Sequence, residues 1–278
     1  MRTQADASIV DVVPRDLEKL LMGGPLAIAL AVAPPSLVEA QDAMRGLDMS
    51  SPDMTTAEMT RAQVEAALAA TQGRGTDLSG KRLSGLDLSG LNFSHTNLRA
   101  ARLNHANLSG ANLDGAVLDQ AWALGANLSL ASGVKASLFA TQLAGANLDG
   151  ANLAEARVTA DLNGARLVGA RLEKADCGAD LKNQSMGLMR ASFKSADLTG
   201  ADLTGANLTL ADLQFAKLKG ANFAGATLHG ADASGADLRG ANLDGADVSG
   251  LDVNSARIDS ASAPLLAAAI HLDRAFRE

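Results

Sequence analysis

Hydrophobic residues return every five positions along most of this chain. In the stretch "ADLTGADLTGANLTLADLQFAKLKGANF", residues 196–223, each Leu or Phe of the five-residue series follows an Asp, Asn or Lys, and an Ala stands two positions before it. A period of five matches neither the 3.6 residues of an α-helical turn nor the two-residue alternation of a strand. The pattern therefore predicts a repeat architecture, in which neighbouring units together bury a core that no single unit can bury alone.

The Leu or Phe position, here named the centre, can be followed from residue 76 to residue 260. One residue is missing before Leu162, and a second slip places a centre at Leu181. The register is lost in the following "KNQSMGLMR" and is regained at Leu188 or Phe193. We therefore predict a repeat domain over residues 76–260 with a register break near residues 177–190.

These units resemble the pentapeptide-repeat family, whose motif is A-[DN]-L-x-x. The resemblance implies an all-β solenoid, a right-handed quadrilateral β-helix in which four units form one square turn. In that fold the centre and the small residue two positions before it point inward, and the other three positions point outward. The inward positions here are Leu, Phe and Ala, and the outward ones are mostly polar or Gly. Residues twenty apart are then expected to stack on one face.

The open ends of such a stack expose unpaired backbone groups, so a cover is expected at each end. Residues 55–75 predict an N-terminal capping helix, with Thr60 and Gln63 as a capping box and Val64 and Leu68 in its apolar stripe. Gly73 is expected to end this helix. The fold class predicted is therefore a β-solenoid with short α-helical caps at both ends.

Residues 261–278 predict the second cap, a C-terminal helix with Ser262 as its N-cap. Two interpretations of this helix stay open. It covers the last coil, or it forms a homodimer contact, since some members of the family pair through their C-terminal ends. Residues 1–54 are expected to be an extension or linker with short helices. The apolar run at residues 25–35 packs on the solenoid or belongs to a partner interface.

Composition narrows the function classes. The 278 residues carry a formal net charge of −7 with no basic run, which argues against direct nucleic-acid binding. The single cysteine, Cys177, rules out an internal disulfide and suits a reducing compartment. No segment is long and apolar enough to cross a bilayer. We expect a soluble protein of the bacterial cytoplasm.

No constellation for catalysis or metal binding stands out in the sequence. His95 and His105 lie two units apart, hence on opposite sides of a square coil, so a shared metal is not expected. The glycines are turn positions of the repeat rather than a phosphate-binding loop. We therefore expect no enzyme activity and no cofactor.

Outward positions become unusually apolar between residues 116 and 140. Contiguous exposed apolar surface marks interaction sites, and Trp is a frequent hot spot. Either a partner protein binds this patch, or the apolar N-terminal segment covers it. The residues of the predicted patch are Val117, Trp122, Leu124, Leu130, Val134 and Phe139, with Arg82 and Arg102 expected to stack below Trp122.

A second surface feature is an acidic ladder, Asp212, Asp232 and Asp252, whose members are twenty residues apart. Some family members resemble duplex DNA in size and charge and bind type II topoisomerases. The ladder would then belong to a DNA mimic. The alternative is that these residues only serve the repeat motif, because Asp side chains hydrogen-bond locally in turns.

The function predicted is a non-catalytic scaffold that binds a protein partner. A Pro-, Asp- and Met-containing linker, the helix "MTRAQVEAALA" and the coils "GTDLSGKRLSGLDLSGLNF" follow one another. This order resembles pentapeptide-repeat regions attached to accessory or adaptor proteins of bacterial type VI secretion systems. The alternative is a DNA-mimicking modulator of DNA gyrase or topoisomerase IV that confers inhibitor resistance.

Overall fold

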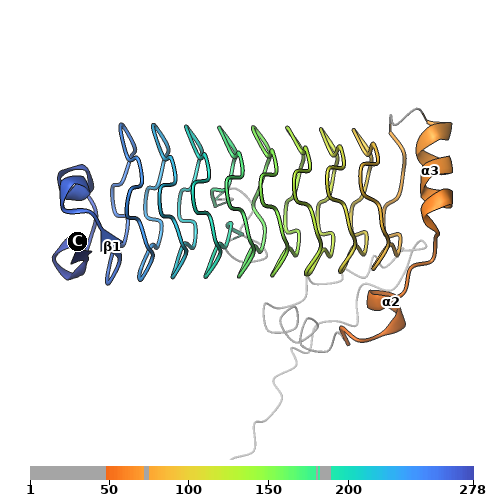
Figure 1. The fold of residues 1–278 in the computed structure, drawn as a ribbon, viewed down its shortest axis with the longest axis horizontal. Coiled ribbons are helices and arrows are strands. Elements are labelled where there is room, and N and C mark those ends of the chain that lie inside the picture. The colour runs from red at the N-terminus through yellow and green to blue at the C-terminus, as the bar shows by residue number, and fades with distance from the viewer. Residues whose placement is uncertain (1–47, 72–74, 180, 182–188) are drawn as a thin grey trace, which may run out of the picture.

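The computed structural model describes residues 48–71, 75–179, 181 and 189–278. Figure 1 shows a row of stacked coils with a helix across the N-terminal end and the C-terminal segment at the other end. The elements that the structure assigns are listed in chain order: α2 (Pro52–Thr55), α3 (Arg61–Ala70), β1 (Arg257–Ile258), the 3₁₀ helices η1 (Ser260–Leu266) and η2 (Leu272–Arg274), and β2 (Phe276–Arg277).

Backbone pairing between coils follows the five-residue units. The outward residue just before each centre forms a parallel bridge with its counterpart one coil further on, as Arg82 does with Arg102. Four such columns run along the molecule, and they define four faces. Faces A, B, C and D begin at Asp77, Arg82, Asp87 and Asn92 respectively. The straight segments are bridges rather than long strands because the chain turns again within each unit.

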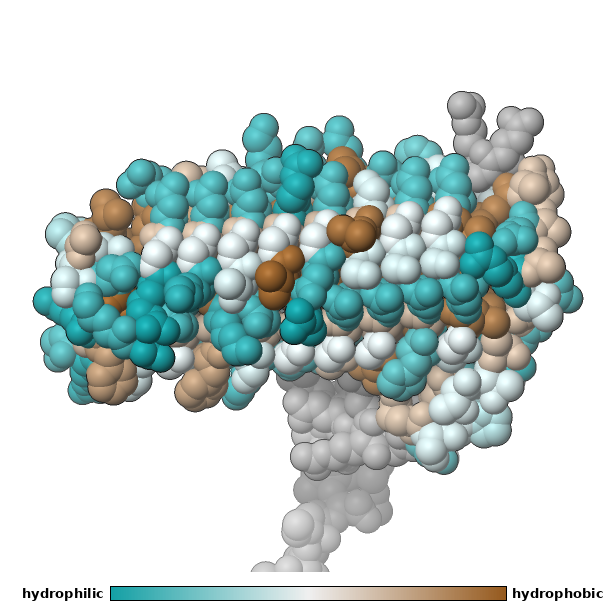
Figure 2. Space-filling view, in the orientation of Figure 1, coloured by the Kyte–Doolittle hydropathy of each residue, from teal (hydrophilic) through white to brown (hydrophobic). Residues whose placement is uncertain are grey.

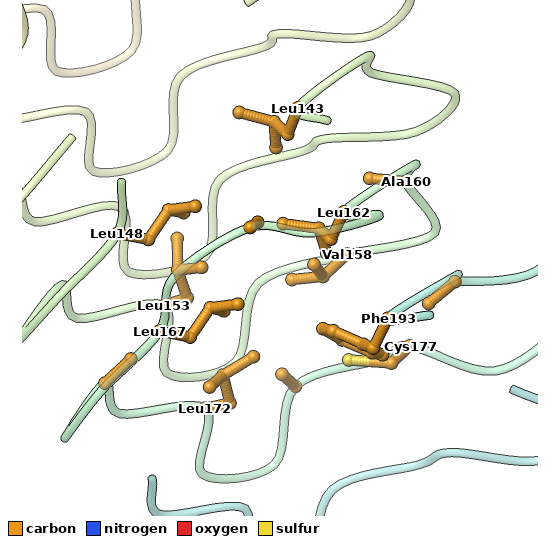
Figure 3. Close-up of a cluster of buried hydrophobic side chains, with 14 of the residues drawn as sticks. Leu143, Leu148, Leu153, Val158, Ala160, Leu162, Leu167, Leu172, Cys177 and Phe193 are labelled. Carbon is orange, nitrogen blue, oxygen red and sulfur yellow. The ribbon is translucent and has the colours of Figure 1, made fainter. Parts of the chain in front are cut away.

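The interior contains the centres and the small residues two positions before them. Leu98, Leu143 and Phe193 are fully buried, and so are the alanines that precede most centres. Figure 3 shows such side chains from successive coils projecting into one interior. Burying one Leu contributes roughly 1.5–3 kcal/mol. Cys177 occupies a centre, where burial raises the pKa of its thiol and makes the thiolate scarce.

The Asp or Asn before each centre builds the turn that follows. Its Oδ1 accepts a hydrogen bond from the backbone N–H two residues later, as Asp87 does from Ser89 at 3.1 Å. Asparagines also link the coils: on face C the Asn107 amide donates to Asp87 at 2.9 Å, and the Asn127 amide donates to Asn107 at 3.0 Å. Where Asp or Asn occupies the motif position, its side chain therefore supports the fold.

The two register changes have different outcomes. Gln142 pairs with Asp161, so the one-residue deletion before Leu162 is confirmed and face B continues across it. Asp161 then pairs with Ser192, and coils that elsewhere lie twenty residues apart lie thirty-one apart at this point. The predicted centre at Leu181 is wrong, since that side chain is 55% exposed. It lies in the inserted segment, and Phe193 takes the centre. Leu188 lies outside the described residues.

The N-terminal cap agrees with its prediction. Thr60 and Gln63 form the capping box of α3, and Val64 and Leu68 are buried against the first coils. The proposed stop at Gly73 lies outside the described residues. Arg61 adds a contact that the pattern did not predict.

The first coil has no preceding coil to supply donors for its carbonyl groups. Arg61 donates from Nη1 to the Asp87 carbonyl at 3.0 Å and from Nη2 to the Ser89 carbonyl at 3.1 Å. In later coils these carbonyl positions accept backbone N–H groups, as Asn107 and Ser109 do from Leu88 and Gly90. The planar guanidinium therefore replaces two backbone donors of a missing coil.

The C-terminal cap is not the predicted α-helix. This segment instead contains the two 3₁₀ helices η1 and η2, and the N-cap of η1 is Asp259 rather than Ser262. The Asp259 side chain makes no capping hydrogen bond to η1 and accepts the Gly240 N–H instead. Pro264 lies inside η1 and has no N–H to donate to a helical ladder.

Strand-like pairing closes this end. Ile270 bridges Asp252 on face B, and β2 pairs in parallel with β1 on face C. Glu278 binds Arg239 at 2.7 Å and also Arg257. A partial coil satisfies the open backbone groups of the last full coil, which an α-helix with internally paired groups cannot do.

We predict that Arg61→Ala lowers the free energy of unfolding by about 1–2 kcal/mol, because two edge carbonyls lose a charged donor that is partly solvent-exposed. Arg61→Lys should recover less than half of the loss, since an ammonium does not reach both carbonyls in a fork. Chemical denaturation followed by circular dichroism measures both variants. Arg274→Ala, at an exposed position, is the control and should change stability by less than about 0.5 kcal/mol. Equal stability of Arg61→Ala and the control would refute this capping role.

Gly133 occupies a centre on face D where other coils place Leu or Phe. A small cavity of about 10 Å³ lies there among apolar side chains that include Leu113, Leu128 and Leu153. We predict that Gly133→Ala stabilises the protein by about 0.5–1 kcal/mol, because it restricts the unfolded chain and fills part of the void. The Leu153 methyl, 3.0 Å from the new Cβ, needs to shift slightly.

Gly150→Ala is the matched contrast for this prediction. Its new Cβ would lie 2.8 Å from Leu130 Cδ2, and Gly150 has φ +64°, a conformation that alanine adopts only with strain. The melting temperature should therefore rise for Gly133→Ala and fall for Gly150→Ala. A lower melting temperature in both variants would show that the cavity cannot accept a methyl group.

Candidate protein-interaction surface

The predicted apolar patch does not form one surface. Trp122 and Leu124 lie on face B, whereas Val117 and Phe139 lie on face A. Val134 lies on face D, and Leu130 lies at the corner between faces C and D. Consecutive five-residue units occupy consecutive sides of the square, so residues close in sequence are distributed around the rod. The expectation of one contiguous patch is therefore wrong.

Exposure separates the members further. Leu130 is 75% exposed, while Trp122 and Leu124 are half-buried. The Phe139 ring is covered by the Arg157 guanidinium, whose carbon lies 4.0 Å from the ring centroid. On the side drawn in Figure 2, apolar residues appear as separate spots on a mainly hydrophilic surface. The part of the predicted patch that forms a unit is therefore the face B pair.

The stacking of Arg82 and Arg102 below Trp122 is confirmed, and the column continues much further. The one-residue deletion and the long insertion leave face B in phase, so the column of Trp122 and the acidic ladder are the same column. We name it the face B column. Its members are Arg82, Arg102, Trp122, Gln142, Asp161, Ser192, Asp212, Asp232, Asp252 and Ile270. Charge along it changes from basic near the N-terminal end to acidic near the C-terminal end.

The acidic ladder is held by local hydrogen bonds. Asp212 accepts from the Gln214 backbone N–H at 3.0 Å, and Asp232 accepts from Ser234 at 3.0 Å. Partial burial acts to raise the pKa of Asp232, but hydrogen bonds from Ser234 and the Gln214 side chain outweigh it, so this pKa lies below its ordinary value. Asp252 accepts from Asn254 at 2.9 Å and contacts His271 Nδ1 at 2.9 Å. The ladder is therefore real, and each carboxylate in it also stabilises the fold.

Two residues that the sequence analysis missed flank face B in a single coil. Leu210 and Phe215 occupy turn positions with φ of 59° and 57°, where most other units have glycine. Each lies over the glycine of the next coil, since a Cβ at Gly230 or Gly235 would come within 2.8 Å of it. Phe215 is 59% exposed. A bulky residue at a glycine position was the available sequence signal.

The segment before α3 covers the first coils of face B. Met54 is only 2% exposed, and its carbonyl accepts the Asn104 side-chain amide at 3.1 Å. Asp53 binds Arg82 at 2.6 Å, and the Glu58 N–H donates to the Arg82 carbonyl at 2.9 Å. We name residues 51–59 the N-terminal arm. The expected linker is therefore docked, and it stops one coil before Trp122. The apolar run at residues 25–35 lies outside the described residues.

Among the residues that the structure describes, no group of three or more His, Cys, Asp and Glu side chains is placed to hold a metal ion. Within the same residues, no helix has the length and apolar character needed to cross a membrane.

Structural comparison finds several pentapeptide-repeat proteins. HetL from the cyanobacterium Nostoc sp. strain PCC 7120, involved in heterocyst differentiation regulation, is 29% identical and matches over 72% of this chain and 97% of its own, with a TM-score of 0.38. QnrB1, a plasmid-mediated fluoroquinolone resistance protein, is 18% identical over 64% of this chain and 91% of its own, with a TM-score of 0.47. A thylakoid-lumen protein of Arabidopsis thaliana is 30% identical over 42% of this chain and 73% of its own, with a TM-score of 0.21.

The comparison with curated proteins finds no match. The family model described as "Pentapeptide repeats (8 copies)" matches residues 74–104, 96–132, 135–183, 188–225 and 221–258, well over half of the chain. These matches cover the coils of faces A to D on both sides of the insertion. The four-sided stack is thus the right-handed quadrilateral β-helix of such proteins, and the chain belongs to the pentapeptide repeat family.

Proposed function

We propose that this protein is a non-catalytic scaffold that binds a protein partner, with face B as its main interaction surface. The observation that carries the proposal is the pair of apolar side chains, Leu210 and Phe215, at left-handed turn positions beside this face. Such positions cost a non-glycine residue about 1–3 kcal/mol. Phe215 is largely exposed, so core packing does not repay that cost. An exposed aromatic side chain on a rigid element is typical of a protein contact.

The role in type VI secretion stays a prediction from the order of linker, helix and first coils. Neither the family match nor the three structures described above bears on it. Partner capture tests it directly, because a secretion accessory should retain an effector or a spike component. The location in the bacterial cytoplasm likewise stays a prediction.

The alternative function, modulation of a type II topoisomerase by DNA mimicry, draws on the stacked acidic ladder. Three carboxylates lie on consecutive coils of one face, at a spacing of about 4.8 Å per coil. Duplex DNA carries one charge per about 1.7 Å of its axis. Arg190 Nη2 also lies 3.8 Å from Asp212, so part of the ladder's field is neutralised. QnrB1, which has the same fold type, is named a fluoroquinolone resistance protein. We favour the scaffold because the ladder is sparse and locally bonded.

We predict that replacing Leu210 and Phe215 by glycine abolishes partner capture without lowering the melting temperature. Glycine adopts a positive φ without strain, so the double variant should fold at least as well as the natural chain. Affinity capture from the source organism with mass spectrometry identifies the partner. Thermal unfolding checks the fold.

Ser255→Gly is the matched control, because Ser255 has φ 57° and lies in the same turn column as Phe215. It should keep the partner. Full retention of the partner by the double glycine variant would remove these side chains from the binding surface. If no protein is retained by the natural chain, the scaffold function itself is wrong.

A supercoiling assay with DNA gyrase distinguishes topoisomerase modulation from the scaffold function. We predict no inhibition by the natural protein and no protection against a quinolone. If either effect appears and is lost in the triple variant Asp212→Asn, Asp232→Asn and Asp252→Asn, the topoisomerase role replaces the scaffold proposal. Asparagine retains the Oδ1 acceptor of each turn, so this variant changes charge more than fold.

A further inference from the structure

The N-terminal arm is a segment of this chain that already lies on face B. It presents two carboxylates, Asp53 and Glu58, on either side of a buried methionine, Met54. Asp53 lies 2.6 Å from Arg82 Nη1, and Glu58 lies 3.6 Å from Arg82 Nε and 3.3 Å from Lys81. The arm is therefore an acidic segment with an apolar anchor, helical over Pro52–Thr55 and held in a cation-rich stretch of the face.

The same chemistry is repeated one coil further along without an occupant from the described residues. Arg102 stacks directly on Arg82 and precedes Trp122 in the face B column. Within the described part of the chain, its Nη1 reaches only the Gly80 carbonyl, at 3.5 Å, and its buried Nε has no hydrogen-bond partner. The described residues therefore give this cationic group no counter-charge beside the half-buried Trp122.

Asn104 lies between the part of the face that the arm covers and the part around Trp122. Its side-chain amide donates to the Met54 carbonyl at 3.1 Å, and its Oδ1 accepts the Leu124 backbone N–H at 3.0 Å. Leu124 therefore occupies, one coil on, the column position that Asn104 holds beside Met54. Arg102, Trp122 and Leu124 thus continue the surface on which the arm already lies.

We propose that Arg102, Trp122 and Leu124 form a docking site for an acidic segment of a partner protein, in which a carboxylate binds Arg102 and an apolar side chain packs on Trp122 and Leu124. The charge balance agrees with this. Lys81 and Arg82 pair with the arm carboxylates Asp53 and Glu58, whereas none of the ion pairs found among the described residues includes Arg102. The inference rests on the scaffold function proposed above and gives one of its sites a ligand chemistry.

Trp122 is the only tryptophan and the chain has no tyrosine, so tryptophan fluorescence reports on this site alone. The probe is a synthetic peptide with the sequence of residues 48–59, which carries the acid–Met–acid pattern and no aromatic residue. Added to the full chain, it should change the Trp122 emission in a saturable way. A peptide with the changes Asp53→Asn and Glu58→Gln should bind about tenfold more weakly or worse, as expected for the loss of charged hydrogen bonds.

Arg102→Ala in the full chain should weaken binding of the acidic peptide by about tenfold or more. Arg99→Ala is the control, because Arg99 belongs to the same coil but pairs with Asp119 on face A. It should bind like the natural chain. Circular dichroism establishes that both variants are folded. Equal binding by Arg102→Ala, or equal binding of the neutral peptide, would overturn the proposal.

Acrylamide quenching of Trp122 in the absence of peptide tests whether the chain itself fills the site. We expect quenching typical of a half-exposed indole and little change in Arg102→Ala. Strong protection that Arg102→Ala removes would assign the site to the chain's own residues and overturn the partner proposal. If the site fails these tests while partner capture persists unchanged in Arg102→Ala, the scaffold function stands and uses another surface.

Discussion

The structure depends on parallel backbone pairing between coils, repeated on four sides. In the interior coils the centre N–H donates to a carbonyl of the next coil, and the N–H of the residue before it donates to a carbonyl of the previous coil, as Leu103 and Arg102 do. These bonds place leucines in line along each inner wall, with alanines beside them where a second large side chain would not fit. Backbone satisfaction and core packing are thus set by one geometric repeat. The place of an outward residue within its five-residue unit therefore fixes its position on the surface of the rod.

Both ends of the stack also satisfy the requirement for backbone pairing. At the N-terminal end a guanidinium and a helix replace the missing coil, whereas at the C-terminal end the chain continues the pairing with Ile270 and β2. Sequence periodicity identified the first cap through its capping box, since Thr60 and Gln63 act within a few residues. It misassigned the second cap, because residues 265–270 are apolar enough for a helix, while the open edge favours groups that can pair with it.

The same contrast applies to the surface. The spacing of twenty placed Arg82 and Arg102 below Trp122 correctly, because only the local repeat was needed. The same spacing did not show that Trp122 and the acidic ladder lie in one column. The length of the insertion between them does not tell on which face the chain resumes. The sequence pattern also grouped Val117, Leu130 and Val134 with Trp122, since proximity in sequence hides the rotation by one side per unit. Leu210 and Phe215 were recognisable in principle, as bulky residues at turn positions, but only the positive φ values show their cost.

The face B column presents its side chains at a fixed spacing along the rod. Its side chains recur once per coil, about every 4.8 Å. An α-helix laid along it would advance about 5.4 Å per turn, so the two periods separate by about 0.6 Å at each step. After about four coils the mismatch reaches half of the spacing between coils. A helical partner could therefore follow only a short length of the rod, and a longer contact would need an extended chain or a helix that crosses the column at an angle.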